Sequence, residues 1–185
     1  MKVIFLTSKE ERYEEFKMLV PFKTAMVKYI ERSNHRKEKI EIILPQFMNV
    51  TLEKDDLIIV DFMSYELYAL NGLPGRNNNF IFRVGLENIQ NIAKLRGKTM
   101  IQKTQFKILN DRFKCVKMID YSIKGCLLVD KYTKFKDLDD LFLLESYIAP
   151  FSRIPLRERA IIGSIGMASK LFIDWALRNG YDYNN

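Results

Sequence analysis

A short apolar run bounded by carboxylates constrains the fold of this chain more than any other segment. Residues 55–61 read Asp-Asp-Leu-Ile-Ile-Val-Asp, so that Leu57 to Val60 show no alternation with polar residues. Such a run predicts a strand that is buried on both faces, as in a parallel sheet covered by helices. In sheets of that kind, ligands gather at the carboxyl ends of the strands. Asp61 stands at such an end and is therefore the first candidate site residue.

The N-terminal part of the chain alternates strand-like and helix-like segments. Lys2–Thr7 predicts a first strand, and Ser8 with Glu11 forms a capping box that predicts a helix running to about Ile30. Residues 40–44 are mostly apolar and are followed by a proline, which predicts a second strand. A chain that alternates in this way predicts an α/β fold in which helices pack on a sheet.

The later part of the chain extends this pattern. Residues 106–113 carry a basic, helix-like pattern between two short strands, and residues 137–147 carry an apolar stripe behind an acidic first turn, which predicts another helix. We therefore expect a three-layer α/β domain with a mainly parallel central sheet over residues 1–148. Residues 149–185 would form a short helical C-terminal element packed on that domain.

Positive charge is concentrated in residues 76–136, which we call the basic segment. The chain has a net charge of +7, whereas this segment alone carries 14 lysines and arginines against 4 acidic residues, a balance of +10. Such a segment indicates either an acidic partner, such as nucleic acid or an acidic protein, or an ordinary solvated surface. The candidate contact residues are Arg76, Arg83, Lys94, Arg96, Lys103, Lys107, Arg112, Lys114 and Lys117.

The residues that ordinarily build metal centres and catalytic triads are scarce. The chain has one histidine, His35, and two cysteines, Cys115 and Cys126, so neither a clustered metal site nor a disulfide framework is expected. No glycine-rich phosphate loop follows a strand, and no apolar run approaches the ~18 residues of a membrane span. We therefore expect a cytoplasmic protein with no membrane partner, and we do not expect an enzyme.

Asp61 remains the residue with a clear chemical use. A carboxylate at the end of a buried strand can coordinate Mg²⁺ or accept a phosphoryl group. It can equally end the strand and cap the following helix, which would be a purely structural role. Both interpretations stay open from the residues alone, and Mg²⁺ is the one cofactor that they admit.

Several segments resemble the receiver domains of response regulators. Residues 56–63 are similar to the phosphoacceptor strand of that family, with Asp61 as the acceptor, and Thr104 follows where receivers place their switch hydroxyl. Residues 123–130 are similar to the family's fifth strand. The resemblance implies a receiver or flavodoxin-like fold. The acidic pair that holds Mg²⁺ in receivers and the lysine after their fifth strand are missing here, so the implied protein is a degenerate, pseudo-receiver type.

The C-terminal residues resemble a truncated LuxR-type output domain. Residues 156–162 are similar to the opening of that domain and residues 168–180 to its closing helix, with too few residues between them for a recognition helix. Receivers commonly pair through the face that the basic segment would form, so the resemblance implies a homodimer. The residues expected to anchor the last helix to the core or to a partner subunit are Leu171, Phe172 and Trp175.

These expectations lead to a non-catalytic regulatory protein, a DNA-binding regulator of transcription or a protein that contacts other proteins. Two alternatives remain open. One is a nucleic-acid-binding protein with no role in signalling, whose affinity would fall steeply with salt. The other is a Mg²⁺-dependent protein that handles nucleotides or phosphoryl groups through Asp61 with Glu10 or Glu11.

Overall fold

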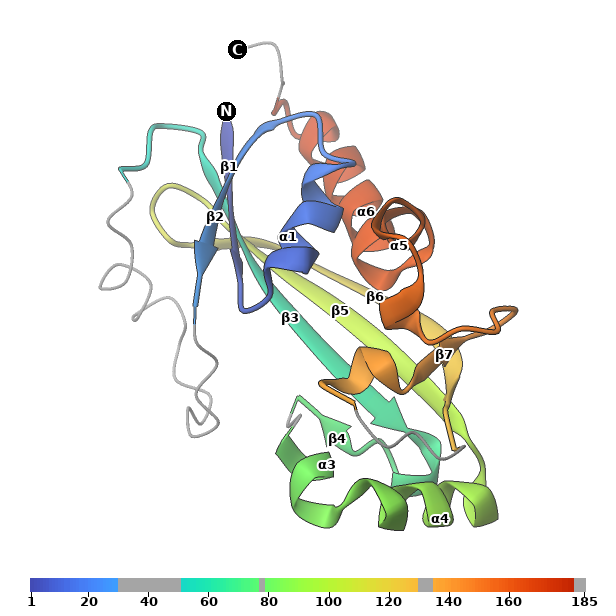
Figure 1. The fold of residues 1–185 in the computed structure, drawn as a ribbon. Helices are drawn as coiled ribbons and strands as arrows, with labels where there is room; N and C mark the ends of the chain where they lie inside the picture. The colour runs from blue at the N-terminus through green and yellow to red at the C-terminus, as the bar shows by residue number, and fades with distance from the viewer. Residues whose placement is uncertain (30–50, 77–78, 130–134, 182–185) are drawn as a thin grey trace.

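A long, twisted sheet forms the centre of the molecule (Figure 1). The computed structural model describes residues 1–29, 51–76, 79–129 and 135–181. Seven strands form one sheet in the order β2-β1-β3-β5-β6-β7, with β4 paired to β3. The strands are β1 (Lys2–Thr7), β2 (Lys23–Lys28), β3 (Leu57–Leu67), β4 (Pro74–Gly75), β5 (Thr99–Leu109), β6 (Cys115–Leu127) and β7 (Phe142–Leu144).

The sheet is mixed, and most of its strand pairs are antiparallel. β1 lies parallel to both β2 and β3, whereas β3 pairs antiparallel with β4 and β5, β5 with β6, and β6 with β7. The expectation of an α/β fold is confirmed. The expectation of a mainly parallel, receiver or flavodoxin-like sheet is wrong, because the three longest strands, β3, β5 and β6, pair antiparallel with one another. The strand expected at residues 40–44 lies outside the described residues.

β5 and β6 form a long hairpin where a basic helix was expected at residues 106–113. β5 alternates buried with half-buried residues along most of its length, which is the period of a strand with one covered face. At the turn, the Oδ1 atom of Asn110 accepts hydrogen bonds from the backbone N–H of Arg112 at 3.1 Å and of Lys114 at 2.9 Å. A short polar side chain that satisfies two amides stabilises a reversal of the chain.

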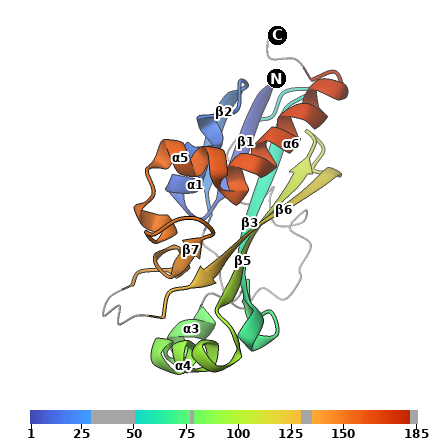
Figure 2. The same cartoon turned by 90° about the vertical axis from the view of Figure 1, so that its right-hand side faces the viewer.

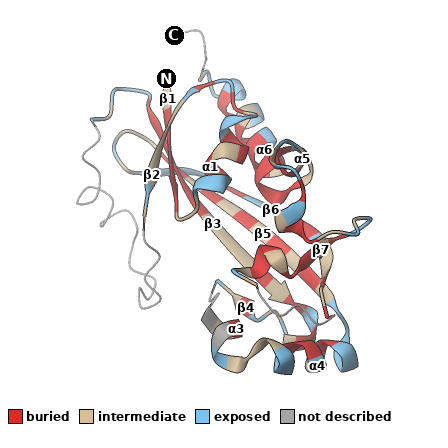
Figure 3. Ribbon diagram, in the orientation of Figure 1, coloured by how far each residue is buried: buried red, intermediate tan, exposed pale blue. Residues whose placement is uncertain are grey.

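Helices α1, α5 and α6 cover one face of the sheet beside β1, β3 and β5 (Figure 2). The buried rings of Phe5, Phe16, Phe106 and Phe172 pack against one another there and form the centre of this core. Figure 3 shows this buried layer between the helices and the sheet. The described helices are α1 (Glu10–Lys17), α3 (Asn79–Val84), α4 (Leu86–Arg96), α5 (Leu156–Ile162) and α6 (Ser164–Arg178).

The second face of the sheet is covered differently. Ile4, Ile58 and Val60 point to that face and pack with side chains from strands and loops, and no described helix lies over them. Three layers are therefore not found in the described part of the chain. The apolar run that predicted β3 is nevertheless buried on both faces, as expected, since all four of its residues are at most 3% exposed.

Two expected helices near the C-terminus fold in other ways. Residues 137–147 form a 3-10 turn, η2 (Leu138–Asp140), followed by β7, rather than a helix. Helices α5 and α6 meet at a tight corner, where a Cβ atom on Gly166 would lie 1.8 Å from the carbonyl oxygen of Ala160. A residue without a side chain is needed for this close approach.

Helix α6 packs on the sheet through one side. Phe172 is fully buried, Trp175 is partly buried, and Leu171 points outward with 43% of its surface exposed. No single described helix is long and apolar enough to cross a membrane, and α5 with α6 passes that test only as a pair bent by 59°. The division of the chain after residue 148 stays a prediction.

Candidate functional site

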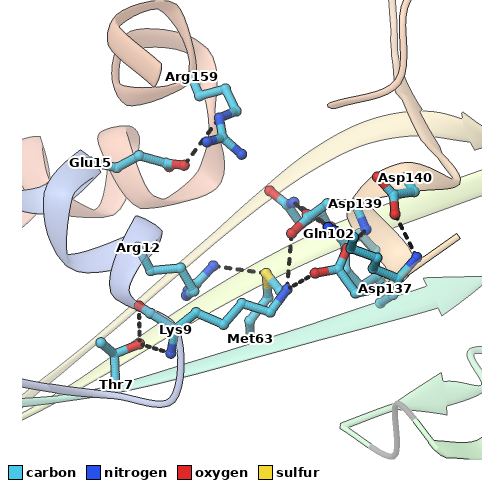
Figure 4. Close-up of polar contacts among 12 residues, drawn as sticks. Thr7, Lys9, Arg12, Glu15, Met63, Gln102, Asp137, Asp139, Asp140 and Arg159 are labelled. Carbon is cyan, nitrogen blue, oxygen red and sulfur yellow. Dashed lines mark hydrogen bonds and ion pairs between the residues drawn. The ribbon is translucent and has the colours of Figure 1, made fainter. Parts of the chain in front are cut away.

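Charged side chains at helical spacing on α1 connect this helix to three other elements. Lys9 precedes the helix as its N-cap, and Arg12 and Glu15 follow at intervals of three residues. Lys9 contacts η2 and the residue before it, Arg12 contacts β3, and Glu15 contacts α5. Figure 4 shows this row of side chains leading from α5 to η2. The row defines the candidate site.

Arg12 and Asp61 form a buried, bidentate ion pair. The Nε atom of Arg12 lies 2.6 Å from Oδ2 of Asp61 and its Nη2 atom lies 2.5 Å from Oδ1, while Thr7 donates a further hydrogen bond to Oδ2 at 2.9 Å. Burial alone would lower the pKa of Arg12, but Asp61 raises it, and the net direction is upward. Asp61 is 3% exposed and both of its oxygens accept hydrogen bonds, so its carboxylate belongs to the interior of the molecule.

Lys9 occupies the point where two carboxylates converge. Its Nζ atom lies 2.7 Å from Oδ2 of Asp137 and 3.1 Å from Oδ2 of Asp139. Burial would lower the pKa of Lys9, but Asp139 and Asp137 together raise it above its usual value. Lys9 and Asp137 are partly open to solvent, in contrast to the Arg12 pair, whereas Asp139 is nearly buried. A cation is therefore held by two carboxylates at an accessible place.

Glu15 and Arg159 form a looser buried pair between α1 and α5. The Nε atom of Arg159 lies 3.5 Å from Oε1 of Glu15 and makes no hydrogen bond to any described residue. Burial raises the pKa of Glu15 to about 7, and Arg159 only partly offsets this effect. Glu15 therefore changes its charge near neutral pH.

A shallow cleft opens beside the first turn of α1. It encloses ≈ 490 Å³ and is lined from the β1–α1 turn, the end of β2, the residue that precedes η2 and the start of α5. Four carboxylates and two ammonium groups line it, so a polyanion would meet net negative charge unless a cation came with it. The lining residues are Ser8, Lys9, Glu10, Glu11, Glu14, Lys28, Asp137 and Leu156.

The donor set of the cleft fits a metal ion that arrives with its ligand better than a resident one. Among the described residues, no group of three or more histidine, cysteine, aspartate or glutamate side chains is placed to hold a metal. Asp137 and Asp139 nevertheless direct one oxygen each to a single point, which the Lys9 ammonium fills. Mg²⁺ is commonly bound by one or two carboxylates together with phosphate oxygens of a substrate. These two aspartates meet that description.

The structure places the site residues expected from sequence in two kinds of environment. Asp61 and Thr104 do lie together, because the Nη2 atom of Arg12 contacts both, at 2.5 Å and 3.3 Å. The residues of the basic segment are spread over α3, α4, both faces of the β5–β6 hairpin and its turn. Lys103 pairs with Glu66 at 2.7 Å. Binding of nucleic acid or an acidic protein by this segment, and a homodimer, stay predictions.

Sequence reasoning named two residues that line the cleft, Glu10 and Glu11, as partners of Asp61 for Mg²⁺, but it missed the charged residues that meet beside them. Asp137 and Asp139 were read as ordinary charges at a helix start, and Lys9 and Arg12 had no assigned role. A signal was present in the chain, because charged residues at three-residue intervals share one face of a helix. What the sequence could not show was that each faces an opposite charge from a distant part of the chain.

Comparisons with known proteins identify the architecture. By sequence, the chain matches no protein-family model and no curated protein. By structure, a HAM1 protein from Coxiella burnetii gives a TM-score of 0.68 at 12% identity and covers 96% of this chain and 99% of that one. The chain has the HAM1 fold. The Ham1 protein of Staphylococcus aureus gives 0.65 at 13% identity, over 97% of this chain and 100% of that chain.

A third solved structure bears a functional name. It is a nucleoside-triphosphatase / dITP/XTP pyrophosphatase from Mycobacterium abscessus, with a TM-score of 0.55 at 13% identity, over 92% of this chain and 98% of that chain. The HAM1 fold thus accounts for nearly the whole chain, including the C-terminal helices that sequence likened to a LuxR-type remnant.

These findings overturn the receiver interpretation. The solved structures that resemble this chain are HAM1 proteins and a nucleoside triphosphatase, not response regulators or LuxR-type proteins. The predictions of a non-catalytic regulator and of a DNA-binding transcription factor rested on that resemblance and are wrong with it. The expectation that the chain is not an enzyme, which rested on its few histidines and cysteines and the missing phosphate loop, is wrong as well. The findings favour the alternative of a protein that handles nucleotides.

Proposed function

We propose that this protein is a nucleoside triphosphate pyrophosphatase, which converts a nucleoside triphosphate and water to the monophosphate and pyrophosphate. The observation that carries the proposal is the convergence of Lys9 with Asp137 and Asp139 at an open cleft, at 2.7 and 3.1 Å, within a HAM1 fold. The name of the Mycobacterium abscessus neighbour suggests dITP and XTP as the first substrates to test. We keep the expected cytoplasmic location as part of this proposal.

The charges of the cleft suit a triphosphate that brings its own cation. Lys9 and Lys28 supply ammonium groups that can donate to phosphate oxygens, and residues of the first turn of α1 line the same cleft. When Lys9 turns to the phosphates, Asp137 and Asp139 lose the cation that they now share. Both carboxylates are then placed to hold Mg²⁺ jointly with the nucleotide, and bound Mg²⁺ would neutralise phosphate charge.

The buried parts of the row have a supporting role in this proposal. The Arg12–Asp61 pair fixes α1 to β3 directly behind the cleft, since both side chains are at most 7% exposed. Glu15 and Arg159 fix the same helix to α5. Lys9 therefore projects from a helix that is held at two further points, which limits movement of the cleft wall.

Hydrolysis assays with purified protein test the proposal. We would incubate the chain with Mg²⁺ and dITP, XTP, dATP or dGTP, and quantify monophosphate and pyrophosphate. Asp137→Asn and Lys9→Met should each lower kcat/KM at least about tenfold, because one removes a carboxylate and the other an ammonium from the cleft. Asp140→Asn is the matched control, because Asp140 belongs to η2 but binds the backbone N–H of Lys136 at 2.7 Å and does not line the cleft.

The outcomes separate clearly. Release of equal amounts of monophosphate and pyrophosphate, lost with the Asp137 and Lys9 variants but not with Asp140→Asn, supports the proposal. Absence of turnover with every triphosphate, with a normally folded chain, would contradict it. Equal effects of all three variants would place the reaction elsewhere in the molecule.

A further inference from the structure

A line of buried polar side chains leads from the Arg12–Asp61 pair to Asp139 at the cleft. It crosses β5, the first residue of α6 and β3. The link from Arg12 to Thr104 is a long hydrogen bond of 3.3 Å, and the next three links are 2.6 to 2.7 Å. All its members are buried: Thr104, Gln102, Ser164 and Tyr65 are at most 1% exposed, and Asp139 is 7% exposed. The members in order are Arg12, Thr104, Ser164, Gln102, Tyr65 and Asp139.

The hydrogen bonds of this line can be donated in one direction only, from Arg12 toward Asp139. Arg12 has no acceptor, so Thr104 accepts from its Nη2 atom at 3.3 Å. Ser164 donates its one hydroxyl proton to Oε1 of Gln102 at 2.7 Å, and the 2.7 Å contact between Thr104 and Ser164 must therefore be donated by Thr104. Either hydroxyl could in principle be the donor between Thr104 and Ser164, but their other partners, Arg12 and Gln102, decide that Thr104 donates.

The same direction continues to the carboxylate. The Nε2 atom of Gln102 donates to the hydroxyl oxygen of Tyr65 at 2.6 Å and to Oδ1 of Asp139 at 3.1 Å. Tyr65 then donates its own proton to Oδ1 of Asp139. Every donor in the line points away from the cation and toward the anion, and hydrogen bonds aligned in this way strengthen one another.

The two oxygens of Asp139 have separate tasks as a result. Oδ1 receives the buried donors Tyr65 and Gln102, whereas Oδ2 faces Lys9 at the cleft. Burial and the neighbouring Asp139 raise the pKa of Tyr65 well above its usual value, so Tyr65 keeps its proton and stays a donor. The carboxylate cannot rotate without losing two hydrogen bonds that no solvent replaces.

We propose that Ser164, Gln102 and Tyr65 are positioning residues that link Asp139 to the charge of Arg12 and aim its second oxygen at the Lys9 ammonium, which lines the cleft. The hydrogen-bonded line is present in the structure whatever reaction the protein catalyses, while the use of Asp139 toward a nucleotide rests on the proposed function. Replacing all of these polar side chains together by apolar residues of similar size would cost little stability, whereas leaving one of them buried without its partner is costly. A polar line in such a place therefore serves the carboxylate at its end.

A double-mutant cycle without nucleotide tests the line itself. Ser164→Ala and Tyr65→Phe remove two hydroxyls that do not touch each other, and urea unfolding of both single variants and the double variant measures their coupling. We expect the unfolding equilibrium constants to depart from additivity by about threefold or more. The matched control is Ser169→Ala, another buried serine of α6, whose hydroxyl donates only to the carbonyl of Ile165 in its own helix at 2.8 Å. Ser169→Ala should be additive with Tyr65→Phe.

A second measurement tests the effect on the cleft. Ser164→Ala and Gln102→Leu should lower both kcat/KM and kcat for the triphosphate at least about fivefold, and Ser164→Thr should restore part of the loss. Ser169→Ala should leave both unchanged. Additivity of Ser164→Ala with Tyr65→Phe would overturn the line, whether or not the protein hydrolyses nucleotides. Coupling with unchanged kinetics in an active protein would overturn the positioning role but leave the proposed function intact.

Discussion

The two halves of β3 are stabilised in different ways, the first by apolar packing and the second by buried ion pairs and hydrogen bonds. Residues 57–60 are apolar and buried on both faces, and they pack against β1, β5 and two separate apolar clusters. From Asp61 onward, the residues on the helix-covered face include Asp61 and Tyr65, which are buried and charged or hydrogen-bonded. One continuous strand therefore supplies the core with its first half and the site with its second. The stability of the first half depends on how well its side chains fill the core, and that of the second half on whether each buried polar group has its partner.

The largest effect should come from breaking a buried charge pair in the second half. Asp61→Ala leaves Arg12 buried without its partner and should lower the free energy of unfolding by on the order of 4 kcal/mol, measured by urea denaturation. Arg12→Met combined with Asp61→Leu should recover most of that loss, because no charge remains uncompensated. A double variant no more stable than Asp61→Ala would show that packing, rather than pairing, governs this half as well.

The first half should respond to lost volume alone. Ile59→Ala removes a fully buried side chain and should cost about 3 kcal/mol of unfolding free energy, again measured in urea. Ile59→Val should cost about 1 kcal/mol. No second substitution at a charged position should rescue Ile59→Ala. If one did, the two halves of β3 would not be independent.

A smaller, pH-dependent effect is expected where α1 meets α5. The pKa of Glu15 is raised to about 7, so the folded chain binds this proton more tightly than the unfolded chain does. Its contribution to stability is thus complete below pH ~4.5 and is lost as the pH rises through about 7, by on the order of 3 kcal/mol. Glu15 faces Arg159, Arg12, Asp139 and Asp61.

Thermal and urea unfolding between pH 5 and 8 would measure this effect. Glu15→Gln should flatten the pH dependence of stability relative to the unaltered chain. Glu14→Gln is the control, since Glu14 lies next to Glu15 on α1 but is half-exposed and pairs only loosely with Lys17, at 3.9 Å. A pH dependence that Glu15→Gln leaves unchanged would assign the titration to another group.

The smallest effect separates two neighbours on α6. Leu171→Ala should change the free energy of unfolding by no more than about 0.5 kcal/mol, because the side chain is 43% exposed. Phe172→Ala, one residue further and fully buried, should cost about 4 kcal/mol. Size-exclusion chromatography of both variants would also test the predicted homodimer. A large loss for Leu171→Ala, accompanied by dissociation, would place Leu171 at a subunit interface.

Local patterns predicted the parts of the fold that depend on nearby residues. The run at 57–60, the first strand and the last helix follow from hydrophobicity and spacing, and all three are found. Residues 106–113 were predicted wrongly because β5 alternates basic with buried residues, and its lysines concealed a strand period. The helix predicted to reach residue 30 stops at Lys17, and Lys23–Lys28 pairs with β1 as a strand.

The sequence by itself determined an α/β fold and the buried apolar run at residues 57–60, because burial and periodicity are written in consecutive residues. The expected strand end at Asp61 is wrong, since β3 continues through Asp61 to Leu67. It did not determine the direction of strand pairing, which depends on contacts between residues dozens of positions apart. Only the tertiary structure decided that Asp61 forms a buried ion pair with Arg12, and that Lys9 forms ion pairs with Asp137 and Asp139 beside the cleft. Ion pairs of this kind join charges about 50 to 130 residues apart, and no local pattern specifies which opposite charge will be the partner.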